Sequence, residues 1–148
     1  MNAFDLKSVL LARHAQHVVL IHFPIALFLV SVAFDFAAHR WSKAAFATAA
    51  YYNLTVAAVS SVPAVATGLM AWHWQLEGQK LKGTLLLHLL LGLASTLLIW
   101  LVWWVHFRCR KPERSLPAYR FPLELTAAAV VALTAHLGGF LSGVNAGV

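Results

Sequence analysis

The chain of 148 residues is 61% hydrophobic and 11% charged, with a mean hydropathy of +0.74. In soluble domains roughly a quarter of the residues are charged. This composition therefore excludes a soluble domain and indicates an integral membrane protein. The formal net charge of +6 comes from basic residues in loops beside apolar spans. That placement favours membrane lipid as the partner and argues against nucleic acid.

Residues 1–16 mix charged and apolar side chains, which predicts a short amphipathic segment at the membrane interface. The first apolar span follows, from about 18 to 38, and contains Pro24. Because proline lacks an N–H, we expect the regular helix to begin near His22 or to bend there. Further along this span, Asp35 stands one turn from His39, which predicts a helix-end pair rather than a proton path.

Three further spans are expected at about 44–72, 83–106 and 122–144. At about 20 residues per crossing, the chain then has room for four helices, short loops and no second domain. The sequence therefore predicts one all-α domain, an antiparallel four-helix transmembrane bundle.

We expect the polar residues at the ends of the last two spans to be solvated or to stabilise a helix end. His106 stands beside basic residues, as His39 does, so both are expected to be solvated. Pro122 and Glu124 suit the first turn of the fourth helix, where a missing N–H costs nothing and a negative charge favours the helix dipole. Cys109 is the single cysteine, which excludes an intrachain disulfide or a cysteine metal cluster.

The distribution of Lys and Arg predicts the topology. Seven of them lie in the first and third loops, against four in the N-terminus, second loop and C-terminus together. The positive-inside rule then places both termini outside the cytoplasm. We expect a multi-pass protein of the bacterial inner membrane with periplasmic termini.

Histidines recur inside these spans, although bilayer interiors disfavour ionisable groups, so each one is a functional hypothesis by default. With the predicted topology, four of them should lie in one layer below the outer face: His22, His73, His88 and His136. Helices contributing one imidazole apiece at a common depth suggest a buried site.

A pair of facing imidazoles can hold haem b, whose macrocycle suits an apolar interior. Small residues follow the histidines at helical spacing and leave room for a flat ring, although such faces also serve ordinary helix packing. Up-down connectivity places the first and third helices diagonally, so the preferred axial pair is His22 with His88. His73 and His136 could form a second pair, giving two haems, or bind haem propionates. Zinc or copper would also accept imidazoles, but the layer lacks carboxylates and thiols.

Several segments resemble the small membrane family catalogued as domain of unknown function 2231. They are the run HVVLIHFPI beginning at His17, the histidine His88 at the head of the third span, and the glycine-rich end at 138–141 and 147–148. The resemblance covers nearly all of residues 17–148 and implies a four-helix membrane protein. Family members joined to Rieske or cytochrome c domains imply a redox role, with His17, His22 and His88 at matching positions. His136 stands where a small residue is common in the family.

These observations favour a membrane electron-transfer subunit that does no bond-making catalysis itself. It would relay electrons between a periplasmic cytochrome c or Rieske-type partner and the membrane or quinone pool, within a homo- or hetero-oligomer. Two alternatives stay open: a structural or assembly subunit without a cofactor, and a transporter or sensor that uses its histidines for metal or protons. No serine-histidine-acid set, phosphate loop or catalytic acid pair is visible, which argues against hydrolases and kinases.

Overall fold

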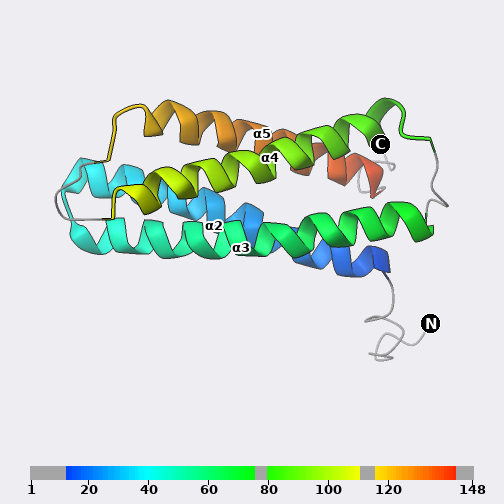
Figure 1. Ribbon diagram of the computed structural model, residues 1–148, viewed down its shortest axis with the longest axis horizontal. Coiled ribbons are helices and arrows are strands. Elements are labelled where there is room, and N and C mark those ends of the chain that lie inside the picture. Colours follow the sequence, from blue (N-terminus) through cyan, green and yellow to red (C-terminus); the bar gives the residue numbers. More distant parts are fainter. Residues whose placement is uncertain (1–12, 76–79, 111–115, 143–148) are drawn as a thin grey trace.

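The computed structural model describes residues 13–75, 80–110 and 116–142 and is built from four helices (Figure 1). They are α2 (Arg13–Trp41), α3 (Ala44–Gln75), α4 (Gly83–Arg108) and α5 (Arg120–Leu141). Each is long and apolar enough to cross a membrane, so the predicted all-α membrane fold of four helices is confirmed. The last residues of the predicted fourth span, 143 and 144, lie outside the described residues. The predicted interfacial segment falls mostly on residues 1–12, which lie outside the described residues.

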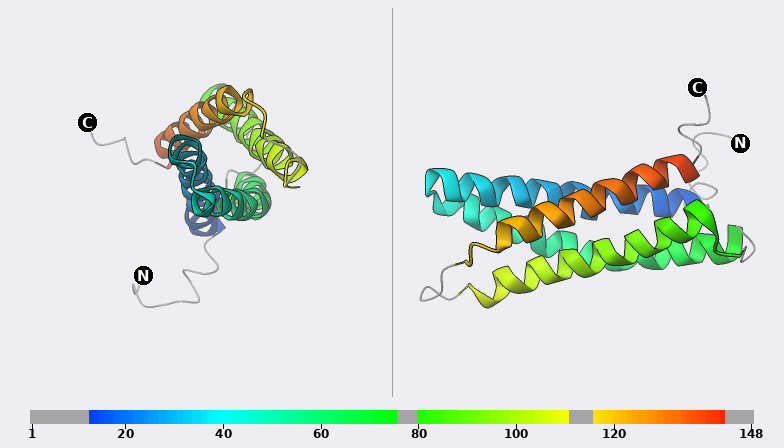
Figure 2. Two further views of the ribbon diagram at one scale, coloured as in Figure 1. Left: turned by 90° about the vertical axis from the view of Figure 1, so that its left-hand side faces the viewer. Right: turned by 90° about the horizontal axis from the view of Figure 1, so that it is seen from above.

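Successive helices run antiparallel and form two hairpins, α2–α3 and α4–α5 (Figures 1 and 2). Around the bundle α2 packs on α3, α3 on α4, α4 on α5 and α5 on α2, so α2 and α4 are diagonal as predicted. We call the end with the two hairpin connections the hairpin end. The opposite end, where α2 begins and α5 finishes, is the terminal end.

The core is built largely from small and branched side chains. Ala50, Ala57 and Ala127 are fully buried, and Phe28 and Leu54 are the largest apolar side chains with no exposure. Because lipid tails are as apolar as leucine, helices in a membrane associate through close packing rather than through a hydrophobic driving force. Each helix also presents large apolar side chains outward, which suits contact with acyl chains.

Pro24 lies well inside α2, which is already helical from Arg13. Of the two alternatives expected for Pro24, the one in which regular helix begins near His22 is therefore wrong. In a membrane an unwound turn would expose several unpaired backbone groups, whereas an internal proline removes a single hydrogen bond. A helix that continues through Pro24 therefore leaves fewer backbone groups unpaired than one that unwinds before it.

The two hairpins repeat one burial pattern. Each matched residue of α4 stands 71 positions after its counterpart in α2, and each matched residue of α5 stands 70 positions after its counterpart in α3. The matched buried residues are Phe28 and Ile99, Ser31 and Val102, and Asp35 and His106 on α2 and α4, with Ala50 and Arg120, Leu54 and Glu124, Ala57 and Ala127, and Ser61 and Val131 on α3 and α5. The bundle thus consists of two hairpins that bury corresponding positions and run in the same direction.

Candidate functional site

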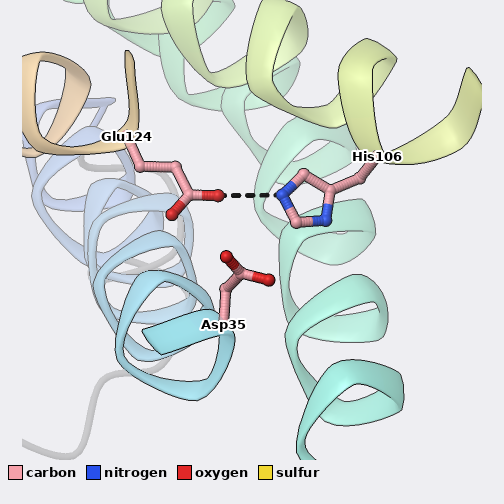
Figure 3. A group of neighbouring side chains, drawn as sticks. All are labelled: Asp35, His106 and Glu124. Atoms are coloured by element: carbon pink, nitrogen blue, oxygen red, sulfur yellow. Dashed lines mark hydrogen bonds and ion pairs between the residues drawn. The ribbon is translucent and has the colours of Figure 1, made fainter. Parts of the chain in front are cut away.

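Four polar side chains are buried together at the hairpin end. Asp35 of α2, His106 of α4, and Arg120 and Glu124 of α5 are between 1% and 8% exposed. Arg120 Nε donates to Asp35 Oδ2 at 2.7 Å, and His106 Nε2 lies 2.8 Å from Glu124 Oε1. Figure 3 shows the two carboxylates and the imidazole converging from three helices. We call these four residues the buried polar cluster.

The helical repeat explains how the cluster is positioned. Asp35 stands seven residues after Phe28, and His106 seven after Ile99, so both polar groups continue a core-facing stripe. Glu124 lies in the same way seven residues before Val131. The His106–Glu124 contact joins α4 to α5 within one hairpin. The Arg120–Asp35 pair instead joins α5 to α2, so it is a contact between the two hairpins.

Three expectations from the sequence are wrong at this end. Asp35 pairs with Arg120 rather than with His39, which is exposed and contacts the ring of Phe121 at 4.9 Å. His106 is 5% exposed and is not solvated. Glu124 is 1% exposed and binds His106 instead of serving the first turn. The missed signal was the seven-residue spacing that puts these polar groups on apolar core stripes.

His88, at the terminal end, is held against α5. Its Nδ1 lies 3.2 Å from the carbonyl oxygen of Thr134. Because a carbonyl oxygen only accepts, Nδ1 carries the proton, and Nε2 of the neutral ring carries the lone pair. A Cβ on Gly138 would come within 3.1 Å of the His88 ring, so the imidazole lies directly on the α5 backbone. Ser95 stands seven residues after His88 on the same face of α4, and its Oγ lies 2.9 Å from Thr134 Oγ1.

His17 occupies the matching place in the other hairpin. Its Nδ1 lies 3.1 Å from the carbonyl oxygen of Ala64 and 3.3 Å from Thr67 Oγ1 on α3. A Cβ on Gly68 would meet the His17 ring at 2.9 Å. In both hairpins, therefore, an imidazole bonds a backbone carbonyl and packs on the glycine four residues further along. His17 and His88 are the inward-facing histidines of the terminal end.

The other three predicted histidines belong to the same end and are exposed on the surface of the bundle. His22 bonds the Val18 carbonyl of its own helix through Nδ1 at 2.6 Å. His73 stacks edge-on with Trp74 at 5.4 Å, and His136 with Phe140 at 5.0 Å. The antiparallel topology thus brings the histidines to one end, where His17 and His88 are partly buried and the other three are exposed.

Among the described residues, one group of three His, Cys, Asp or Glu side chains offers ligand atoms within 4.8 Å of one another: Asp35, His106 and Glu124. These are not the residues singled out as cofactor ligands from the sequence. The same hairpin end carries a surface hollow of about 370 Å³, lined by Trp104, Val105, Arg108, Cys109 and Tyr119. The hollow lies at the hairpin end and not between the predicted histidines.

The close approach of His88 to α5 gives a test with adjacent glycines. Gly139→Ala should raise stability by about 0.5–1 kcal/mol, because alanine favours the helix and a Cβ there meets no described atom within 4 Å. Gly138→Ala should gain less or lose stability, because the His88 ring must move. Thermal unfolding in detergent micelles measures the difference. Equal gains in both variants would contradict the packing of His88 on Gly138.

Comparison with known families gives one match. The model of a family described as "Predicted membrane protein (DUF2231)" matches residues 13–146. No curated protein and no solved structure matches the chain. The family description specifies a membrane location and no activity, so the function has to be argued from the two ends of the bundle.

Proposed function

Because this chain belongs to the DUF2231 family of predicted membrane proteins, and because two partly buried histidines at its terminal end, His17 and His88, bond neighbouring helices, we propose that it is a haem b-binding electron-transfer subunit. The haem would lie at the terminal end, between helices that contribute His17 and His88. The proposal keeps the expected orientation, with this end facing the periplasm of a bacterial inner membrane. Partners would be membrane lipid, a periplasmic cytochrome c or Rieske-type protein, and quinone.

The observation that supports this proposal best is the anchoring of His88. Histidines that ligate metals usually donate their second ring N–H to a carbonyl or carboxylate, which fixes the tautomer and makes the ligand nitrogen more basic. The Thr134 carbonyl does this for His88 Nδ1. The ring is thereby prepared to offer Nε2 as an axial ligand.

His17 supplies the second ligand in this proposal, although the sequence motif favoured His22. His17 has the same carbonyl anchor as His88, and it lies seven residues before the buried Pro24, on the core stripe of α2. His22 is five residues further along and exposed. His73 and His136 keep their proposed roles as a second pair or as partners of haem propionates.

Haem, when bound, carries one electron at a potential that depends on its axial ligands and their surroundings. The chain contributes the two anchored imidazoles and an apolar interior, and the glycines at 68 and 138 let those rings approach the backbone. Apolar outward faces keep the site at a fixed depth in the bilayer. This arrangement supplies position and potential, and bond-making chemistry would belong to a partner.

The absorption spectrum of the full-length protein tests the proposal. Purified from membranes of haem-sufficient cells, the protein should show a Soret band and, after reduction with dithionite, split α and β bands typical of two imidazole ligands. Haem addition to protein from haem-limited cells should restore both. A spectrum without these bands after haem addition would refute haem binding.

A further inference from the structure

We propose a second site that is independent of haem: a divalent transition-metal site formed by His106, Glu124 and Asp35 at the hairpin end. A metal ion there would bridge α2, α4 and α5. The donor atoms lie within 4.8 Å of one another and come from side chains that are at most 5% exposed.

The first support is the geometry. Metals of the zinc type bind imidazole nitrogen and carboxylate oxygen at about 2.0–2.2 Å, with three protein ligands and one open position in many sites. Ligand atoms around such an ion are separated by less than twice that length. In Figure 3 the side chains of His106, Glu124 and Asp35 all point into the space between their helices. Small rotations would therefore bring the donors to one ion.

The second support is an unsatisfied acceptor. Glu124 Oε1 lies against His106, but Oε2 is buried and has no hydrogen-bond partner among the described residues. A buried acceptor left without a partner costs about 1–3 kcal/mol, and more when it is charged. The residue as a whole is 1% exposed, so bulk water does not relieve this cost. A cation beside Oε2 would relieve it.

The third support is the charge within the cluster. Asp35 and Glu124 bring two carboxyl groups and Arg120 brings one guanidinium, so with both carboxyl groups ionised and His106 neutral the cluster has an excess of one negative charge, which a bound cation would balance. Uncompensated charge in such a site is costly. Arg120 also has a positioning role, because it holds Asp35 Oδ2 through Nε while its Nη1 donates to the carbonyls of Leu116 and Pro117.

The donor set selects the class of metal. Calcium and magnesium prefer sites built from oxygen alone, and copper(I) prefers sulfur. One imidazole with two carboxylates suits Zn²⁺, Fe²⁺ or Mn²⁺. Zn²⁺ is the practical probe because it has no redox chemistry of its own.

The experiment measures Zn²⁺ binding to the full-length protein in detergent after removal of metal with a chelator. Equilibrium dialysis should give one Zn²⁺ per chain that persists in His39→Gln, a matched control because His39 is an exposed histidine at the same end. Glu124→Gln and His106→Gln keep the size of each side chain closely and should lose this Zn²⁺. The loss should exceed the 10- to 100-fold weakening typical of changes to outer-shell partners.

Two further arms make the result decisive. His88→Ala should keep the Glu124-dependent Zn²⁺, which separates this site from the terminal-end histidines and from the fate of the haem proposal. Saturating Zn²⁺ should raise the melting temperature of the native chain but not that of Glu124→Gln. Absence of binding to the native chain, or undiminished binding to a folded Glu124→Gln variant, would overturn the metal site.

Discussion

Asp35→Leu should lower the stability of the bundle by about 3–5 kcal/mol, the cost of breaking a buried ion pair by removing one partner. Arg120, which is only 8% exposed in the native chain, would lose the carboxylate to which its Nε donates. Because the pair connects α2 to α5, the loss should also loosen the two hairpins against each other. Unfolding by heat or by sodium dodecyl sulfate, followed by circular dichroism, measures the effect.

Removing both charges tests the origin of the stability lost in Asp35→Leu. The loss comes either from breaking up a buried ion pair or from losing a contact that is itself stabilising. Asp35→Leu combined with Arg120→Met should recover most of the lost stability, since a buried ion pair replaced by apolar side chains is often neutral or stabilising. Arg40→Met serves as the control, because Arg40 is exposed at the same end and surface changes usually stay within about 0.5 kcal/mol. An Asp35→Leu variant as stable as this control would contradict the buried pair.

His88→Ala and His17→Ala should each abolish haem binding with two imidazole ligands. Both changes remove an imidazole that is anchored on a neighbouring helix, whereas the other predicted histidines of the terminal end, His22, His73 and His136, are exposed. The haem content per chain and the split α and β bands of the reduced protein measure the loss. In a His88→Gly variant, free imidazole should restore the bands, because the vacated space can accept the missing ring.

The histidine variants also separate the two possible ligands on α2. His22→Ala and His39→Ala should retain the spectrum, since both side chains are exposed. Loss of haem in His22→Ala with full retention in His17→Ala would contradict the choice of His17. That result would favour the pair His22 and His88, which the sequence motif indicated first.

The fold could be predicted from the sequence because membrane helices obey strong local rules. Long apolar runs such as 83–106 have few structural options in a bilayer, where every backbone group must bond internally. Polar turns after Trp41 and before Gly83 mark where the spans end. The positions of the terminal-end histidines followed from the same reasoning, because antiparallel helices fix which residues share an end.

The buried polar cluster could not be predicted in the same way. Asp35 and Arg120 are 85 positions apart, and their contact depends on how two hairpins pack. Nearby surface partners such as His39 therefore looked sufficient for Asp35. The distinction between His17 and His22 was also hidden, because both lie in one motif and only the packing of α2 on α3 places one of them inward.

Low-temperature electron paramagnetic resonance of the oxidised protein tests the central functional claim most directly, because it reports the axial ligands of a haem iron. The account predicts a low-spin ferric signal of the kind given by two imidazoles, which should change to high-spin in His88→Ala. A native protein loaded with haem that shows only a high-spin signal, or the same low-spin signal after both His17 and His88 are replaced, would contradict it.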